Sequence, residues 1–280
     1  MRIHIITVVL LLSTAIFSCS KETSVEKDNQ PYKGCKVASM VALETATGKP
    51  LYALNTLFSA GGVPREIEAI DSVTGRPDFI QPMDIRKDSV ILSDGQYFLL
   101  DANNRVRKLM IREDPTDPAS DAFIFQYTYD VSGYLIEKKV STPALPITLL
   151  TYNYTWTNGN LTSVEGRLTA ALNPVRIFLA DMQYDLNVTP KDFIYIFPDG
   201  AESFMFSMAF DYGKKNKNLL RRMTVVYYDD QGVQTDAYAT DFRDVKLSPE
   251  GYVKEWLADG DSMDPFGIFA GRIRFDYFCN

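Results

Sequence analysis

Apolar and polar residues alternate along much of the chain in short runs that end at turn residues. The clearest run is Phe125–Leu135, where aromatic residues alternate with polar ones as far as Asp130 and a short polar turn contains Gly133. An aspartate side chain can bind backbone groups two residues further on, and glycine readily adopts the positive φ that such a turn requires. This pattern predicts a β-hairpin.

Looser copies of this hairpin occur on both sides of it, with turns at residues 101–104, 158–159, 211–213, 229–232 and 249–251. Solenoids and propellers require a regular period, whereas the spacing of these turns is irregular. Hairpins that follow one another in sequence order instead predict an antiparallel meander. We therefore expect an all-β fold. It is a single large antiparallel meander sheet, curved or forming an incompletely closed barrel, with at most one short helix.

Two stretches carry more specific predictions. Thr189 is a candidate N-cap followed by a proline, which favours a short helix over a strand in residues 189–197. In residues 204–210 every second side chain is large and apolar, which predicts a half-buried strand.

Residues 1–18 have the features of a signal peptide. They contain a cationic start and the apolar run Ile5–Phe17, which is shorter than the roughly 20 residues needed to span a bilayer. The run ends in Ile16-Phe17-Ser18-Cys19, which resembles the lipobox of bacterial lipoproteins. The resemblance implies cleavage before Cys19 and lipidation of Cys19, whose acyl chains would anchor the protein in a membrane. An ordinary signal peptide followed by a chance cysteine is the alternative.

The residues after Cys19 carry a second resemblance. Ser20-Lys21-Glu22 is similar to the signal that exports Bacteroidetes-type lipoproteins to the cell surface, although Thr23 stands where a second acid is common. This implies an outer-membrane protein that faces outward, with the periplasmic leaflet as the alternative. Residues 19–33 are polar and aperiodic, and predict a flexible tether. Residues 34–280 have no Ser-, Pro- or Gly-rich break and predict a single antiparallel β domain.

The turn pattern also resembles a known repeat. Its aromatic-Tyr-Asp-x-x-Gly-x-Leu units are similar to the YD repeats of Rhs-type surface proteins, in looser form. With the lipobox and the Lys-Glu leader, the chain resembles a family of Bacteroidetes surface lipoproteins with a porin-like β fold. The resemblance covers about residues 36–278 and rests on turn chemistry. Departures are Asn104 in place of a turn glycine and the inverted order of Asp211-Tyr212. The family implies a large curved sheet and transfers no catalytic residue.

The composition excludes several classes of function. The chain has a formal net charge of −7, and removal of residues 1–18 takes away its single histidine. An acidic chain without a basic cluster is a poor partner for nucleic acid. Without imidazole, a Ser-His-Asp triad, a Cys-His dyad or a histidine-ligated zinc site cannot form. We expect no cofactor and no metal site, because the acidic run Asp259–Asp264 lacks the spacing of an EF-hand loop.

Four further residues are candidates for special roles. Cys35 and Cys279 lie at the two ends of the predicted domain, in a compartment where disulfides persist, and predict a disulfide that joins those ends. Two separate thiols are the alternative. Trp156 and Trp256 are candidates for stacking on the sugar rings of a ligand. Aromatic residues also favour strands and pack across them, so core packing is the preferred interpretation of both.

These observations favour a non-enzymatic outer-membrane lipoprotein, held to the membrane through Cys19, that binds a glycan or protein ligand or serves in a surface assembly. One alternative is a lipid or lipoprotein carrier that holds an acyl chain against a concave apolar sheet face. The other is a carboxylate-only glycoside hydrolase. A membrane-spanning barrel is disfavoured, because outward positions such as Glu137–Lys139 and Arg272–Arg274 are charged. The sequence does not predict an oligomeric state.

Overall fold

The computed structural model describes residues 34–93, 96–112, 122–170, 173–198, 206–260 and 271–279. These residues form one antiparallel sheet of 17 strands. The strands are β1 (Cys35–Leu43), β2 (Pro50–Phe58), β3 (Pro64–Asp71), β4 (Arg76–Pro82), β5 (Asp84–Ile85), β6 (Ser89–Ser93), β7 (Gln96–Leu100), β8 (Val106–Arg112), β9 (Ala122–Tyr129), β10 (Leu135–Thr142), β11 (Leu145–Thr157), β12 (Asn160–Leu168), β13 (Val175–Asp185), β14 (Leu219–Tyr228), β15 (Gln234–Leu247), β16 (Val253–Gly260) and β17 (Gly271–Cys279).

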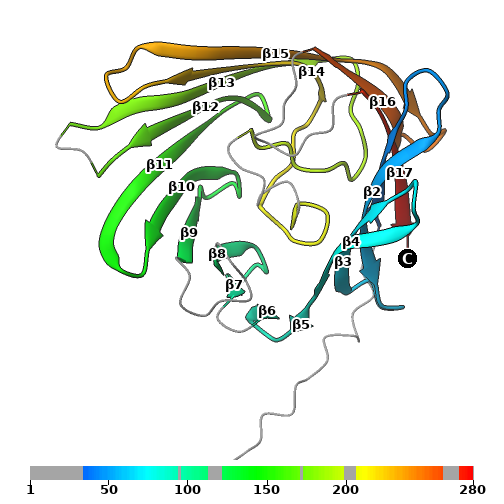
Figure 1. Ribbon diagram of the computed structural model, residues 1–280, viewed down its shortest axis with the longest axis horizontal. Helices are drawn as coiled ribbons and strands as arrows, with labels where there is room; N and C mark the ends of the chain where they lie inside the picture. Colours follow the sequence, from blue (N-terminus) through cyan, green and yellow to red (C-terminus); the bar gives the residue numbers. More distant parts are fainter. Residues whose placement is uncertain are drawn as a thin grey trace, which may run out of the picture.

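The sheet curls into a barrel that is closed except at one seam (Figure 1). From β5 to β17 each strand pairs with the next along the chain, and β17 then pairs with β1, so the two terminal strands close the wall. The series continues from β1 to β4. Within the described residues, β4 and β5 have no ladder between them. The predicted all-β fold, a single antiparallel meander in an incompletely closed barrel, is confirmed.

The seam has a physical cause in β4. This strand pairs with β3 along its length, whereas β5 pairs with β6, so the chain changes partner near Met83. Pro77 and Pro82 lack the N–H that a second neighbour would bind, and proline is typical of unpaired strand edges. A side chain spans the gap instead: Nε2 of Gln81 donates to the backbone O of Leu92 in β6 at 2.8 Å.

Because the strands alternate in direction, the turns fall alternately on two rims of the barrel. One rim holds Cys35 at the start of β1 and Cys279 at the end of β17, and we call it the tether rim. The turns after β7, β9, β11 and β15 lie on it. The turns after β1, β3 and β14 lie on the opposite rim.

The predicted turn chemistry is present in the hairpins. In the turn after β9, Oδ1 of Asp130 accepts the N–H of Tyr134 at 2.8 Å, and Gly133 has a φ of 91°. Asp101 and Asp229 each accept an N–H two residues on, at 2.8 Å and 2.9 Å. Asn104 takes the place of a turn glycine with a φ of 62°, as asparagine tolerates.

The connection between β13 and β14, residues 186–218, does not form a hairpin. Its described residues, 186–198 and 206–218, run through the interior of the barrel, where Figure 1 shows them in yellow-green and yellow at the centre of the ring of strands, and we call them the plug. Phe193–Phe197 and Phe206–Phe210 are buried within it. Rings of the plug pack against rings of the wall, as Phe193 does with Trp256 at a centroid distance of 5.2 Å.

Three sequence predictions fail in the plug. The helix predicted for residues 189–197 is absent, and this stretch is irregular. The strand predicted for residues 204–210 is also absent from its described part, because Phe206–Phe210 forms a helical turn in which the N–H of Phe210 donates to Phe206 O at 3.0 Å. Phe204 and Met205 lie outside the described residues. The turn at 211–213 belongs to the plug and not to a hairpin. Within the described part of the chain, no helix has the length and apolar character needed to cross a membrane.

The hairpin turns of the tether rim hold the plug. The N–H groups of three plug lysines donate to the carbonyl oxygens of three turn glycines: Lys214 to Gly133 at 2.9 Å, Lys217 to Gly159 at 2.9 Å and Lys191 to Gly251 at 3.0 Å. These are backbone bonds, so the turn conformation and not the lysine charge provides them. The recurrent turns therefore position the plug as well as the strand register.

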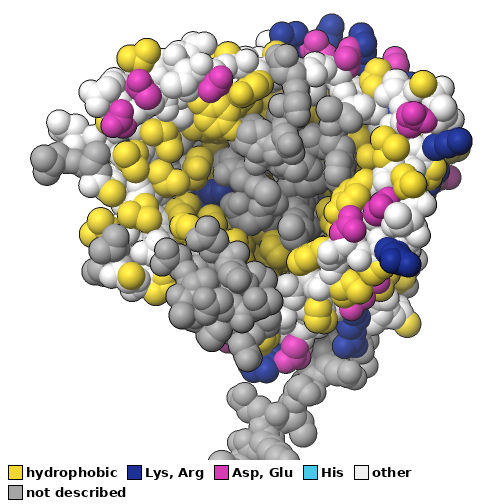
Figure 2. Space-filling model, viewed as in Figure 1, with side chains coloured by type: hydrophobic (Ala, Val, Ile, Leu, Met, Phe, Trp, Pro, Cys, Tyr) yellow, Lys and Arg dark blue, Asp and Glu magenta, His cyan; other side chains and the backbone are white. Residues whose placement is uncertain are grey.

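The barrel is largely apolar inside and charged outside. Lys138 is an exception: the outward position predicted for it is wrong, because it is 1% exposed and its ammonium lies over the rings of Phe125 and Tyr152. The fully buried side chains that point inward include Met40, Ile67, Phe98, Leu109, Leu135, Leu161, Met223 and Phe275. The outer face carries ion pairs such as Glu165 with Arg176 at 2.6 Å and Glu255 with Lys246 at 2.8 Å. Figure 2 shows hydrophobic side chains around the mouth of the barrel and charged ones along its outer edge. A membrane-spanning barrel has an apolar band on its outer face. The ion pairs on the outer face of this barrel are instead suited to contact with water.

Candidate functional site

The barrel wall parts between β14 and β15 at the tether rim. The ladder between these strands ends at the pair Arg222–Asp241, and Leu219–Arg221 have no partner on β15. Each strand keeps its other neighbour up to the rim: Leu219 pairs with β13, and Leu247 pairs with β16. The two strands therefore diverge and leave an opening between them, which we call the β14–β15 groove.

A β-bulge lies on each side of this opening. In β14, Arg222 and Leu220 pair with consecutive residues of β13, so Arg221 is the extra residue. In β15 the register with β16 shifts between Arg243 and Lys246, and Asp244 has a φ of 52°. Bulges bend a strand and redirect its side chains, and they are frequent at barrel rims and next to functional sites. These two bulges separate the strands and place Arg221 and Asp244 at the edges of the groove.

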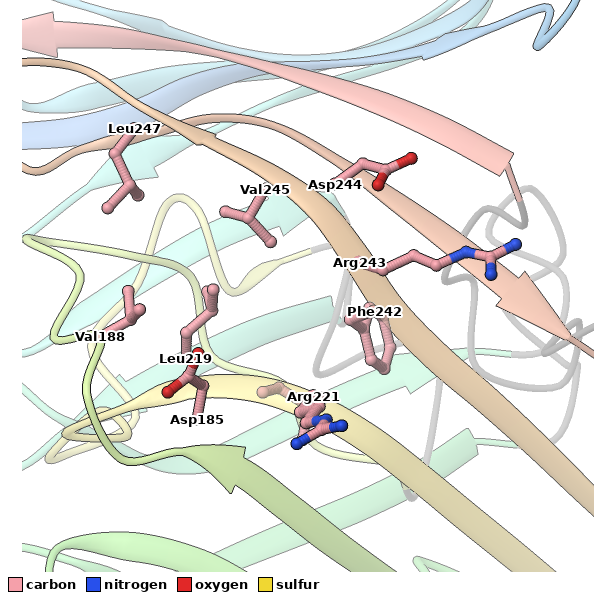
Figure 3. Close-up of a pocket in the computed structure, with 10 residues that line it drawn as sticks. Asp185, Val188, Leu219, Arg221, Phe242, Arg243, Asp244, Val245 and Leu247 are labelled. Atoms are coloured by element: carbon pink, nitrogen blue, oxygen red, sulfur yellow. The ribbon is translucent and has the colours of Figure 1, made fainter.

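The groove has a volume of about 330 Å³ and an apolar floor. Figure 3 shows Phe242, Val245 and Leu247 pointing from β15 towards Val188 and Leu219, whereas Arg243 and Asp244 point away from that space. Phe242 and Leu219 are buried, and Leu247 is 42% exposed. The floor therefore offers apolar contact to a ligand without a deep cavity.

Charged side chains surround the mouth, and all but one are engaged. Arg243 is paired with Asp259, and Arg272 lies 3.9 Å from Asp244. The Asp185 carboxylate accepts the N–H of Asn187 at 3.0 Å. Arg221 is exposed and, among the described residues, has no hydrogen bond or ion pair. Its guanidinium is therefore available to an anionic ligand group. The sequence contained no signal for it, because the bulge that places it depends on pairing between distant strands.

The structure brings the two predicted disulfide residues together. Cys35 and Cys279 are opposite each other in the β1–β17 ladder, and their sulfur atoms are 1.98 Å apart. They join the two ends of the sheet at the tether rim. Cys19, the predicted lipidation site, lies outside the described residues.

The two tryptophans do not form a common site. Trp256 is 1% exposed and packs against Phe242 and Phe275 at centroid distances of 4.8 Å and 5.3 Å. The core packing preferred from the sequence is therefore confirmed for Trp256, and its buried position in β16 rules out the alternative of stacking on a ligand. Trp156 is half-buried near the tether rim, where its ring lies 4.6 Å from that of Tyr134. Its Nε1 donates to Leu135 O at 2.7 Å. A stacking role for Trp156 stays a prediction.

A cluster of charged side chains lies where β1 meets the plug, with Lys36 and Lys215 half-buried and Asp192 and Asp211 exposed. Burial lowers the pKa of Lys215 to about 8, against the attraction of Asp192 and Asp211. Burial also lowers the pKa of Lys36. The Tyr195 hydroxyl lies 2.8 Å from Oδ1 of Asp211, and burial together with that carboxylate raises its pKa. These groups attach the first strand to the plug.

We expect the stability of the protein to increase from about pH 8 towards about pH 10. Below that range Lys215 is charged in both the folded and the unfolded chain. Within it the folded chain has lost the proton and the unfolded chain still holds it, so rising pH favours the folded state. Urea unfolding from about pH 7 to about pH 9.5 measures the slope. In Lys215→Met the increase should be smaller, and an unchanged slope would assign the effect to other groups.

The described residues contain no arrangement that suggests catalysis. Burial and the neighbouring Glu68 raise the pKa of Glu66, but both lie on the outer face of β3 and not in a cleft. Among the described residues, no cluster of three or more His, Cys, Asp or Glu side chains is arranged to hold a metal ion. Of the acidic run Asp259–Asp264, residues 261–264 lie outside the described part.

No family model and no curated protein matches this sequence. Among the solved structures with a similar fold are two porin-like proteins. One is a porin-like protein from Bacteroides uniformis, with a TM-score of 0.56, 9% identity and coverage of 89% of this chain and 97% of the other. The second is a porin-like protein from Bacteroides vulgatus, with a TM-score of 0.54, 13% identity and coverage of 86% and 98%. At these identities the likeness concerns the fold. The predicted porin-like fold is confirmed, and the predicted lipoprotein and YD-repeat relationships stay predictions.

Proposed function

We propose that this chain is a non-enzymatic, lipid-anchored protein of the outer membrane that binds a ligand in the β14–β15 groove. The observation that carries the proposal is the groove itself: a parted wall, an apolar floor and the unpaired Arg221 at its mouth. Ligand sites are typically apolar with a few polar groups that provide orientation. The resemblance of Ser20-Lys21-Glu22 to the surface-export signal implies that the protein faces the cell exterior.

The charged outer face supports the lipid anchor. A barrel wall that carries ion pairs such as Arg222–Asp241 does not enter the hydrocarbon layer by itself. An acylated Cys19, joined through residues 20–33 to β1 at the tether rim, would supply the membrane attachment that the wall lacks.

The alternative functions have less support. A lipid carrier needs space against the concave apolar face, but the plug packs against this face through Phe193, Phe197 and Phe206. A glycosidase needs two carboxyl groups about 5–9.5 Å apart on either side of a bound sugar. Within the described residues, the cleft at β14–β15 contains Asp185 and Asp244, and Figure 3 shows them on different strands with Asp244 turned away.

Ligand binding is tested with the soluble domain from residue 34. A glycan array, a peptide library and mass spectrometry of co-purified lipids are compared for the native chain, Arg221→Ala and the matched control Arg76→Ala. Arg76 is exposed at the start of β4, away from the groove. We expect one ligand class whose binding is reduced only by Arg221→Ala. Binding that both variants preserve would place the site elsewhere.

Replacement of Cys19 by alanine should abolish lipidation of the protein. Cells fed an alkyne fatty acid should label the native chain and Ser20→Ala, and should not label Cys19→Ala, because the thioether that carries the lipid requires the cysteine thiol. Label on Cys19→Ala would refute the lipidation prediction, and protease treatment of intact cells tests which side the domain faces.

A further inference from the structure

We infer that the ligand of the β14–β15 groove is an extended polypeptide segment that carries a carboxylate, bound by the strand edges and by Arg221. This inference rests on the proposed function and names the ligand class of the same site. Its occupant would be part of a protein partner, so the groove would serve in a surface assembly.

The strand edges point to a polypeptide. Beyond the pair Arg222–Asp241, the side of β14 that faces β15 has no strand partner, and neither does the facing side of Phe242–Asp244. An extended peptide can use such edges for main-chain hydrogen bonds, as in β-strand addition. The N–H of Leu219 already donates to Val188 O at 3.0 Å, so the usable part of the β14 edge begins after Leu219. Sugars and acyl chains have no repeated backbone that matches a strand edge.

The floor fits the side chains of an extended segment. Residues of a strand point alternately to opposite faces, so every second side chain of a bound segment would face the groove. Val188, Val245 and Leu247 provide apolar contact there (Figure 3). The lining contains no tryptophan or tyrosine, the aromatic residues that would stack on a sugar, and its one aromatic side chain, Phe242, is 4% exposed.

The charges at the mouth point to one carboxylate. A guanidinium binds a carboxylate through two parallel N–H donors. The guanidinium of Arg221 is exposed and can donate both hydrogen bonds to a ligand. Arg243 is already paired with Asp259. Asp185 and Asp244 also line the groove, and their negative charges disfavour a second acid in the ligand. The ligand is therefore a mostly apolar segment with one acidic side chain or a C-terminal carboxylate.

The probe is a library of octapeptides with acetylated N-termini and amidated C-termini that alternate apolar and polar residues, with one glutamate moved through each position, beside a second set that has a free C-terminal carboxylate and no glutamate. We expect binding to the soluble domain by fluorescence anisotropy. Arg221→Ala should weaken it at least tenfold, Arg221→Lys by less, and Arg76→Ala should leave it unchanged. Glutamine in place of the glutamate should cause the same loss as Arg221→Ala. N-methylation of alternate backbone amides should abolish binding, which a purely side-chain interaction would not require. Circular dichroism of each variant controls for folding.

Two results would overturn the inference, and they have different consequences. If Arg221→Ala weakens binding of an acidic oligosaccharide or of a fatty acid but no octapeptide binds, the groove is a ligand site and the ligand class is wrong. If no peptide, oligosaccharide or fatty acid distinguishes Arg221→Ala from Arg76→Ala, the inference and the proposed binding site both fail.

Discussion

A Gly213→Ala chain is expected to lose about 2–5 kcal/mol of its free energy of unfolding. Gly213 lies in the plug with a φ of 90°, where a side chain costs about 1–2 kcal/mol. A Cβ atom there would lie 2.4 Å from the backbone O of Gly133 and 2.9 Å from the ring of Tyr129. Neither can move freely, because Gly133 O accepts the N–H of Lys214 and the Tyr129 hydroxyl donates to Val106 O at 2.6 Å.

The matched control is Gly232→Ala. Gly232 has a φ of 79° in the turn after β14, and a Cβ atom there would meet nothing within 4 Å. This variant should therefore lose only the conformational cost of about 1–2 kcal/mol. Urea unfolding of the soluble domain measures both. Equal losses would show that the contact between the plug and the turn after β9 tolerates an added methyl group.

The plug also links the wall to the candidate site. It begins at the end of β13 and ends at the start of β14, and Val188 and Leu219 line the groove. Val188 O accepts the N–H of Leu219, so both ends of the plug meet at the edge of the groove. A variant that displaces the plug should therefore weaken ligand binding as well as stability. Substitutions on the outer face of distant strands should leave binding unchanged.

The hairpins were predictable because their chemistry is local. An aspartate and a glycine or asparagine within one turn determine the reversal, and alternation on both sides determines the strands, as in Phe125–Leu135. The plug was not predictable in this way. Wall side chains surround Phe206–Phe210, so all five residues are buried. Alternation predicts a strand only where one face is exposed to solvent, and this segment has no exposed face. A buried segment of this kind is recognised only when the barrel around it is known.

The candidate site was not predictable for a related reason. Arg221 and Asp244 acquire their positions from bulges, and a bulge is a mismatch between two strands that one strand's sequence does not contain. Core packing of Trp256 was predictable, because aromatic residues in strands usually pack across them. The disulfide residues Cys35 and Cys279 were easier to predict, because they are the two cysteines of residues 34–280 and lie at its two ends.

Reduction of the Cys35–Cys279 disulfide is expected to cost about 5.5 kcal/mol of stability. The bond joins residues 244 positions apart, so it restricts almost the whole unfolded chain, and the chain-entropy model gives about that loss for so long a loop. The two cysteines also end the β1–β17 ladder, which closes the barrel. Without the bond, fraying of this ladder is the easiest local opening, because both strands are terminal.

The measurement is urea unfolding of the soluble domain with and without dithiothreitol, beside Cys35→Ser/Cys279→Ser. Reduction should lower the unfolding midpoint of the native chain to that of the double variant, which itself should not respond to reductant. If the native midpoint is insensitive to reductant while free thiols appear, the β1–β17 ladder holds the two strands together without the bond. Because β16 joins β17 to β15, a loosened closure should also weaken binding in the groove. Loss of stability with unchanged binding would show that the contacts of β14 with β13 and with the plug are sufficient to maintain the groove.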